Sequence, residues 1–379
     1  MNKLRVGILF GGRSGEHEVS LLSAASVLNA IDRSRYDVVP IGISKDGRWL
    51  TAGDAERLLE SRNAKPKAEE KHLRAGDPDA TASALVLERG SEIVFSPVPS
   101  ADALKVDVVF PILHGTFGED GTIQGLLELA DLPYVGAGVL GSAAGMDKDV
   151  MKRLFHEAGL PVVKGITVKR AEWRNMPKKV QKAIEEKLRY PVFVKPANLG
   201  SSVGISKVHD ASELAAALDL AAQHDSKIIV EQGVGGKKNK AREIEVSVLG
   251  NDWPKASVPG EIVPMAEFYD YAAKYLDEGS QLIIPAKLNK RQTREVQELA
   301  LRAFSAVEGA GLARVDFLMD PASKDIYVNE INTMPGFTSI SMYPKLWAAS
   351  GVPYTELITK LIELAVERHA EKKLNRYSR

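Results

Sequence analysis

Short apolar runs alternate with glycine turns and helical stretches in the first part of the chain. Val6–Phe10 is an uninterrupted apolar run, Gly11–Gly15 is a glycine-rich turn, and Glu18–Ala30 has helical spacing. A second apolar run, Val38–Ile43, follows after a short connection. Strand–helix–strand units with short connections form parallel, doubly wound sheets. The opening residues therefore predict an α/β domain.

The same pattern resumes after a polar interruption. Residues 54–80 are rich in charge, and we expect a surface excursion there. Val106–Phe110 and Leu132–Gly136 predict two more strands, with a helix over Gly121–Ala130 between them. We place the end of an N-terminal domain, residues 1–140, just before Gly141.

The remaining pattern predicts two α+β units, residues 141–231 and 232–379. In the first unit the predicted strands are Pro191–Pro196, Ile205–Val208 and Lys227–Glu231, and the predicted helices are Met146–Ala158 and Ser212–Gln223. In the second, the predicted strands are Glu243–Leu249, Gln281–Ile284, Arg314–Met319 and Ile326–Asn332, and the predicted helices are Arg291–Glu308 and Thr355–Glu371.

Composition excludes several classes of function. Lys+Arg and Asp+Glu both total 50, so no global field attracts nucleic acid or an anionic membrane. The chain has no cysteine, which excludes disulfides, thiolate zinc sites and a thiol nucleophile. No apolar run approaches the ~18 to 20 residues of a membrane span. We expect a cytoplasmic protein without nucleic-acid or membrane partners.

The strongest candidate site is a predicted hairpin. Arg314–Met319 and Ile326–Asn332 are joined by a short turn that contains proline. The position of the turn predicts that Asp316 lies roughly opposite Glu330. With Asn332 these residues offer three oxygen donors, which suit Mg²⁺ or Mn²⁺ bridging phosphates.

A solvated acidic face is the alternative to this metal site. Because side chains alternate along a strand, Glu330 and Asn332 are expected on the same face as apolar Ile326 and Val328. A carboxylate on an otherwise buried face costs stability unless it is paired or bound to metal. We therefore favour the metal site.

A glycine–serine loop is the second candidate. Lys195 ends a predicted strand, and Gly200–Gly204 follows with Ser201 and Ser202. Amide groups and a lysine can hold phosphates there, although this is not a Walker A loop and a plain structural turn is about as good an explanation. Lys148 is a second candidate phosphate cation, with a solvated helix lysine as its alternative.

Three weaker motifs complete the set. His114–Gly121 follows a buried strand, where open α/β sheets bind ligands, but a lone histidine such as His114 is more often a structural cap. Gly11–Ser20 lacks the glycine spacing of a dinucleotide site. Its Glu16 either interacts favourably with the dipole of the following helix or binds a substrate ammonium group. Glu267–Tyr275 is rich in aromatic residues and predicts a substrate lid, or a loop packed on its own side chains.

In order and spacing these motifs together resemble the D-alanine–D-alanine ligase family of the ATP-grasp superfamily. The resemblance covers about Leu4 to Leu361 and is most specific at His114–Gly121 and Arg314–Gly336. It implies an N-terminal doubly wound parallel-sheet domain followed by a two-part ATP-grasp fold that clasps ATP. It also implies ATP-dependent ligation of two D-alanines through an acylphosphate for peptidoglycan precursors, with ATP, two Mg²⁺ or Mn²⁺ ions, K⁺ as a further candidate, and a homodimer.

The resemblance also implies roles for individual residues. The metal ligands would be Asp316, Glu330 and Asn332. ATP would be bound by Lys148, Lys195, Ser201, Ser202, Glu231, Val234 and Glu243. Glu16 would bind the ammonium group of the first D-alanine, and Lys274 and Ser341 would hold the carboxylate of the second. His114 would be a further substrate-binding residue. The catalytic set would be Glu16, Ser201 and Tyr275, which close the lid, with Arg314 and the Gly336 amide at the anionic acyl centre.

Three alternatives stay open. A ligase that uses D-lactate or D-serine shares these motifs, although Tyr275 favours an amine acceptor over lactate. Another ATP-grasp enzyme, such as a glutathione-type synthetase, fits less well with His114–Gly121 and Glu16. A catalytically silent ATP-binding module would be expected to lack a metal ligand, and Asp316, Glu330 and Asn332 are all present.

Overall fold

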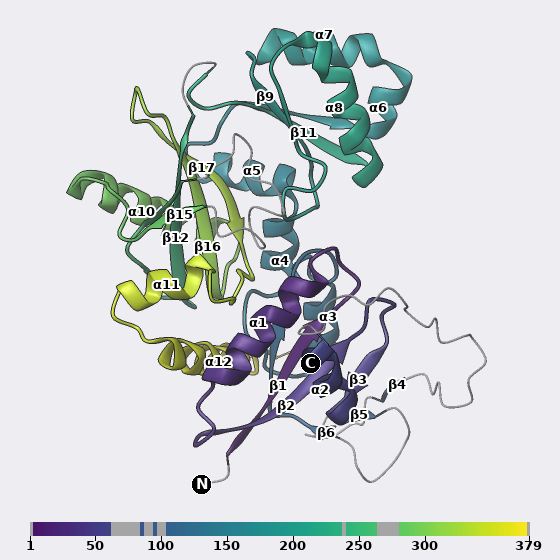
Figure 1. Cartoon of the computed structure of the whole chain (residues 1–379), viewed down its shortest axis with the longest axis vertical. Coiled ribbons are helices and arrows are strands. Elements are labelled where there is room, and N and C mark those ends of the chain that lie inside the picture. The colour runs from purple at the N-terminus through teal and green to yellow at the C-terminus, as the bar shows by residue number, and fades with distance from the viewer. Residues whose placement is uncertain are drawn as a thin grey trace.

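The computed structural model describes residues 3–61, 84–86, 94–96, 104–236, 240–263 and 280–376. Three lobes surround a central region that contains helices α4 (Val139–Met146) and α5 (Lys148–Glu157) (Figure 1). Each large lobe is built on its own sheet, and a small sheet of β4 (Ala84–Val86), β5 (Val94–Ser96) and β6 (Leu104–Lys105) is attached to the first.

The N-terminal lobe is the predicted doubly wound unit. Its sheet has the order β3-β2-β1-β7, with β1 (Leu4–Gly11), β2 (Tyr36–Ile43) and β7 (Val108–Ile112) parallel and β3 (Trp49–Thr51) antiparallel at the edge. Its helices are α1 (His17–Ala30), α2 (Ala52–Ser61) and α3 (Thr122–Leu129). The uninterrupted apolar runs become strands because the central strands are buried on both faces.

One predicted strand of this lobe is wrong. The segment Leu132–Gly136 forms a single bridge, between Tyr134 and Val109, and is not a strand. Left-handed backbone at Asp131 (φ 53°) and Gly136 (φ 102°) turns the chain at both ends of the segment, so the ladder cannot extend.

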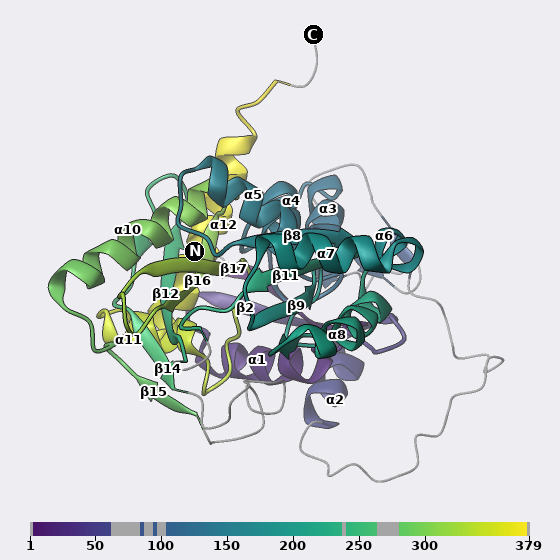
Figure 2. The same cartoon turned by 90° about the horizontal axis from the view of Figure 1, so that it is seen from above.

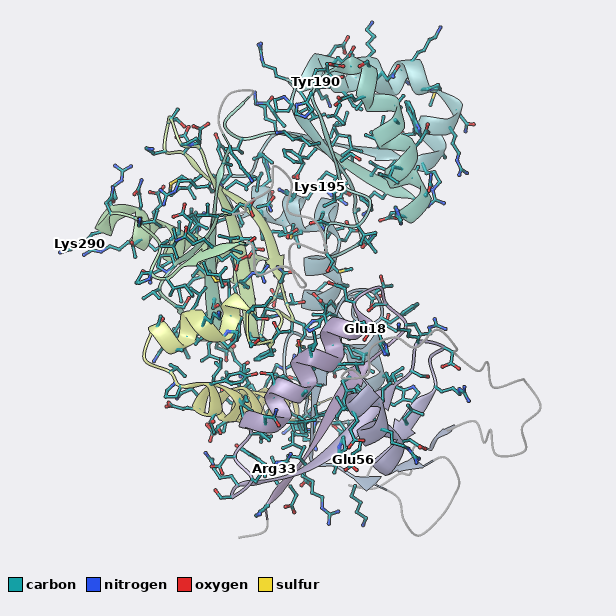
Figure 3. The ribbon with its side chains drawn as sticks, viewed as in Figure 1. Glu18, Arg33, Glu56, Tyr190, Lys195 and Lys290 are labelled. Atoms are coloured by element: carbon teal, nitrogen blue, oxygen red, sulfur yellow. The ribbon has the colours of Figure 1, made fainter. Side chains whose placement is uncertain are left out.

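The second lobe has an antiparallel sheet of order β10-β9-β11-β8. Its strands are β8 (Gly165–Lys169), β9 (Val192–Pro196), β10 (Ser206–Val208) and β11 (Lys227–Gln232), and its helices are α6 (Arg170–Asn175), α7 (Pro177–Lys187) and α8 (Ala211–His224). Lys195 lies on the side of this lobe that faces the rest of the molecule, whereas Tyr190 lies farther out (Figure 3).

The third lobe has an antiparallel sheet of order β15-β14-β12-β16-β17, with β13 (Lys255–Ala256) paired to β12. The strands are β12 (Arg242–Gly250), β14 (Gly260–Val263), β15 (Gln281–Ile283), β16 (Gly311–Met319) and β17 (Ile326–Asn332). Helices α10 (Lys290–Ala306) and α11 (Met342–Ala349) pack against it (Figure 2).

Two packing contacts tie the lobes together. The C-terminal helix α12 (Tyr354–Lys372) shares one hydrophobic core with the N-terminal strands, through Leu357 and Leu361. Met151 and Phe155 of α5 belong to the core of the third lobe's sheet. The division at 140/141 and 231/232 stays a prediction, and its ends fall inside α4 and at the end of β11. Among the described residues, no helix has the length and apolar character to cross a membrane.

Candidate active site

A cleft of about 310 Å³ lies where the three lobes meet. Most of the predicted site residues line it: Glu16, His114, Lys148, Lys195, Ser201, Ser202, Val234, Glu243, Arg314, Asp316, Glu330, Asn332, Gly336 and Ser341. Glu231 is buried and is not among the lining residues. Lys274 and Tyr275, with the motif Glu267–Tyr275, lie outside the described residues.

The register of the β16–β17 hairpin agrees with the prediction, because Asp316 pairs directly with Glu330. The next pair is Phe317 with Val328, so Asn329 is an extra residue that forms a β-bulge. The prediction that Glu330 lies on the same face as Val328 was wrong for this reason. Val328 packs in the core, while the bulge turns Glu330 to the opposite side, into the cleft.

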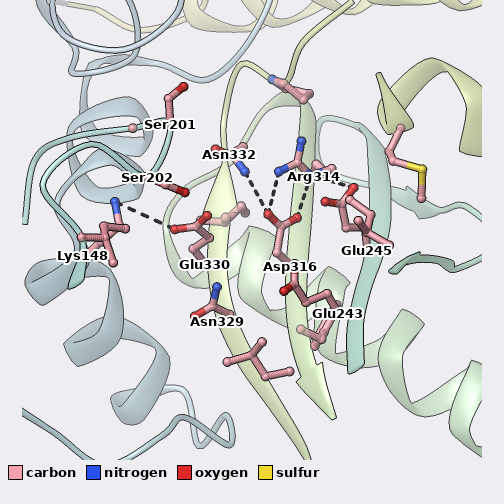
Figure 4. Close-up of a pocket in the computed structure, with 18 of the residues that line it drawn as sticks. Lys148, Ser201, Ser202, Glu243, Glu245, Arg314, Asp316, Asn329, Glu330 and Asn332 are labelled. Atoms are coloured by element: carbon pink, nitrogen blue, oxygen red, sulfur yellow. Dashed lines mark hydrogen bonds and ion pairs between the residues drawn. The ribbon is translucent and has the colours of Figure 1, made fainter. Parts of the chain in front are cut away.

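Arg314 holds the carboxylate of Asp316. Its Nε and Nη2 donate to Asp316 Oδ1 and Oδ2 at 2.7 and 2.6 Å, a two-pronged pair. Asn332 Nδ2 also donates to Asp316 Oδ2, at 3.2 Å (Figure 4). Asp316 is thus positioned by a cation and an amide.

Lys148 and Lys195 bring positive charge to the opposite wall of the cleft. Lys148 Nζ lies 3.9 Å from Glu330 Oε2 and donates to the Leu199 carbonyl at 2.8 Å. The main-chain N–H of Lys148 donates to the Ala197 carbonyl at 3.0 Å, which ties the start of α5 to the loop after β9. The carboxylates of one lobe therefore face ammonium groups on α5 and β9.

Behind Lys195 lies a buried triad of Lys152, Glu231 and Lys195. Lys152 Nζ is 2.6 Å from Glu231 Oε1, and Lys195 Nζ is 2.7 Å from Glu231 Oε2. Burial by itself would raise the pKa of Glu231, but the two ammonium groups outweigh it and lower the pKa to about 2. Burial would likewise lower the pKa of Lys195, and the charges of Glu231 and Glu330 raise it instead. Lys195 thus stays charged at the cleft wall.

The N-terminal end of α1 closes the cleft at Glu16. Ser201, in the loop between β9 and β10, donates a hydrogen bond to Glu16 Oε1. The close approach depends on two glycines, since a Cβ at Gly115 or Gly200 would lie 2.5 or 2.9 Å from Glu16 Oε2. Ser201 and Ser202 both have left-handed backbone, with φ of 52° and 59°. The loop is therefore held in a strained form by a contact to another lobe.

His114 is fully surrounded. Its ring nitrogens contact the Met334 carbonyl and Ser23 Oγ, both at 3.1 Å, and its Nδ1 lies 3.7 Å from Glu119 Oε1. Burial would lower its pKa, but Glu119 outweighs burial and raises it. This ring links the N-terminal lobe to the loop after β17, and it also lines the cleft.

The loop after β17 forms the remaining edge of the cleft. Ser341 Oγ accepts from the Thr338 main-chain N–H at 2.9 Å and lies 2.8 Å from Thr338 Oγ1. A Cβ at Gly336 would lie 2.8 Å from Ser341 Oγ, so the two predicted residues are in contact. A side chain at 336 would push the Ser341 hydroxyl out of this position.

Glu245 and Asn329 are among the cleft residues that sequence reasoning missed. Glu245 is 6% exposed and lines the cleft; its place two residues after Glu243 on a predicted strand was a usable signal. Asn329 lines the cleft through the bulge, and its buried Oδ1 makes no hydrogen bond within the described part of the chain. No sequence signal marks the bulge.

The oxygen donors fit a hard divalent cation. Asp316, Glu330 and Asn332 supply carboxylate and amide oxygens, and cysteine is absent from the chain. Lys148 and Arg314 form ion pairs with Glu330 and Asp316, respectively. An oxygen-rich cleft between two antiparallel sheets, beside a parallel-sheet lobe, is an ATP-grasp-like arrangement.

Comparison with known proteins agrees with this class. The family model described as the D-ala D-ala ligase N-terminus matches residues 5–137, and that of the D-ala D-ala ligase C-terminus matches residues 154–363. The chain belongs to the D-alanine–D-alanine ligase family.

Individual relatives cover nearly the whole chain. This chain is 50% identical over 375 residues to a D-alanine–D-alanine ligase of Heliobacterium modesticaldum, and the match covers 99% of this chain and 98% of the relative. The D-alanine–D-alanine ligase structure from Coxiella burnetii matches with a TM-score of 0.81 and 37% identity, covering 99% and 97%. The VanG D-Ala:D-Ser ligase structure from Enterococcus faecalis matches with a TM-score of 0.80 and 36% identity, covering 96% and 100%.

Proposed function

We propose that this protein joins two D-alanine molecules to D-alanyl-D-alanine at the expense of ATP, forming a C–N bond for peptidoglycan precursors. Full-length relatives at about half identity carry the name of this activity. The observation that carries the proposal is the cleft itself, where Asp316 and Glu330 face Lys148 and Lys195, with buried Glu16 at one end.

The reaction has two steps. The carboxylate of the first D-alanine attacks the γ-phosphorus of ATP, which gives an acylphosphate and ADP. The amine of the second D-alanine then attacks the acyl carbon, phosphate leaves, and the amine loses a proton. Catalysis requires positioning and neutralisation of anionic oxygens, which preorganised cations provide in a site closed to water.

Each role rests on position in the cleft. Lys148 and Lys195 would hold the ATP phosphates, and Glu243 on β12 would contact the adenosine. Glu16 would take the ammonium group of the first D-alanine, with Ser201 above it. Arg314 and the Gly336 amide would stabilise the acyl centre, and Ser341 would hold the carboxylate of the second D-alanine.

The family uses ATP and a divalent metal. Asp316, Glu330 and Asn332 would hold the metal, which when bound supplies Lewis-acid stabilisation of the phosphate oxygens. Two ions, Mg²⁺ or Mn²⁺ as the particular metal, K⁺ dependence and a homodimer stay predictions from the resemblance. Glu231 would act on ATP through Lys195, because the ion pair between them supports an indirect role.

The test is phosphate release with ATP, Mg²⁺ and D-alanine, with mass spectrometry of the product. Parallel reactions contain L-alanine, D-lactate with D-alanine, D-serine with D-alanine, or no amino acid. We expect release and dipeptide only where D-alanine is present, with D-alanyl-D-alanine as the main product. A main product containing D-serine or D-lactate would overturn the acceptor, and no release in any reaction would overturn the activity.

A further inference from the structure

Three carboxylates stand in a row across the third lobe's sheet. Glu245 on β12 pairs with Asp316 on β16, and Asp316 pairs with Glu330 on β17. All three line the cleft. Neighbouring carboxylates with side chains only 8%, 15% and 26% exposed repel one another unless cations separate them.

Arg314 is shared between the first two carboxylates. Its Nε lies 2.7 Å from Asp316 Oδ1 and 3.1 Å from Glu245 Oε2. Figure 4 shows Arg314 between Glu245 and Asp316, with Asn332 on the far side of Asp316. One guanidinium thus has two carboxylate partners, of which Glu245 is the more deeply buried.

The guanidinium and a metal compete for Asp316. Arg314 engages both oxygens of that carboxylate, and its charge repels a divalent cation. A divalent cation would bind Asp316 more readily if another carboxylate held Arg314. Releasing an arginine into a cleft without another partner would leave a desolvated charge, which is costly.

We propose that Glu245 is the positioning residue that holds Arg314 when Asp316 turns to the metal. The inference rests on the metal site of the proposed function. Glu245 acts through Arg314 and is not itself a metal ligand. Replacing a carboxylate that orients groups around a metal commonly weakens metal affinity by about 10- to 100-fold.

Mn²⁺ binding tests the inference without turnover. Free Mn²⁺ is counted by electron paramagnetic resonance in titrations of the protein with saturating ADP. We expect E245Q to weaken Mn²⁺ binding about tenfold, because Arg314 then stays on Asp316. The matched control is E261Q, since Glu261 is equally buried at 7% and pairs with Arg242 on the same sheet, but does not line the cleft.

The double variant E245Q/R314Q separates the two explanations. If Glu245 acts through Arg314, E245Q has no further effect on Mn²⁺ affinity in an R314Q background. The same tenfold loss in both backgrounds would mean that Glu245 binds the cation directly, and would overturn the inference. Unchanged affinity in E245Q would overturn it as well.

E245D serves if E245Q does not fold. It keeps the charge but withdraws the carboxylate from Arg314, so we expect a smaller loss of Mn²⁺ affinity that R314Q again removes. A loss that persists in the R314Q background would count against the inference. Failure of the wild-type protein itself to bind Mn²⁺ with ADP would overturn the proposed metal site, and the inference with it.

Discussion

Replacing Glu231 by glutamine tests how the buried triad holds Lys195. The change keeps the shape of the side chain and removes the only carboxylate that the structure places between Lys152 and Lys195 in its described part. The pKa of the carboxyl group is lowered from 4.5 to about 2. At about 1.4 kcal/mol per pKa unit this corresponds to about 3 kcal/mol of stability.

A second argument gives a similar magnitude. Removing one partner of a buried ion pair typically costs about 3–5 kcal/mol, because the other charge stays buried without compensation. Lys152 is 9% exposed and cannot reach water without rearrangement. We therefore expect Glu231→Gln to lower the free energy of unfolding by about 3 kcal/mol or more.

Urea unfolding followed by tryptophan fluorescence measures this loss. Trp173 reports on the relevant lobe, because it is 6% exposed and packs in the same core as β11. The matched control is Glu363→Gln: the Arg35–Glu363 pair is 2.8 Å long, but its side chains are 51% and 55% exposed. Exposed pairs contribute about 0–1 kcal/mol.

Two results would refute the reasoning. The first is a Glu231→Gln loss no larger than that of Glu363→Gln. The second concerns the double variant Glu231→Gln with Lys152→Met, which removes one of the two uncompensated ammonium charges and should recover part of the stability. If the double variant is no more stable than Glu231→Gln alone, the lysines are not the cause.

Three further predictions concern pH, the metal and the N-terminal end of the cleft. Since the folded pKa of Glu231 is depressed, its contribution is complete above about 4.5 and is lost as pH falls towards about 2; Glu231→Gln should lack this part of an acid-unfolding profile. Glu330→Gln should abolish ADP formation while the circular dichroism spectrum stays unchanged, because the variant loses a charged residue of the proposed metal site. Near-normal turnover of this variant would contradict the assignment of Glu330 as a metal ligand. Gly115→Ala should raise the KM for D-alanine at least severalfold, because φ is +73° and the new Cβ would lie 2.5 Å from Glu16 Oε2. Gly351→Ala is the matched control, because its φ of +88° gives the same backbone strain while no atom lies within 4 Å of the new Cβ. We expect this variant to change the melting temperature only.

The sequence predicted most regular elements and the hairpin that carries the proposed metal ligands. The position of the turn was enough to pair Asp316 with Glu330, whereas strict alternation put Glu330 on the wrong face. The bulge at Asn329 was not predictable, because it is stabilised by packing of Val328 and Ile331 in one core, which depends on residues distant in sequence.

Helix α4 was missed, and the predicted domain boundary near Gly141 falls inside it. A Cβ at Gly141 would lie 2.4 Å from the Glu308 carbonyl oxygen, and one at Gly145 would lie 2.8 Å from Thr333 Cγ2. Close packing therefore requires these glycines, and they do not mark a turn. Asp147 ends α4 and caps α5 by accepting from the main-chain N–H groups of residues 149 and 150.

The roles implied by resemblance depend on contacts that one sequence does not contain. Lys152 and Glu231 are far apart along the chain, and only the fold brings them to 2.6 Å. Likewise Ser201 meets Glu16 across two lobes. Local patterns predict which residues share a strand face, whereas partners between lobes follow from packing.

The bulge in β17 also bears on how such a cleft can change during evolution. A regular strand offers one side chain to a given face about every 7 Å, but here the consecutive residues Asn329 and Glu330 both line the cleft. Deleting Asn329 would leave a regular ladder in which Glu330 and Asn332 keep their side of the sheet. A single-codon insertion or deletion can therefore add or remove one donor while the metal ligands stay in place. In related sequences, a one-residue gap at this position should be compatible with an intact site.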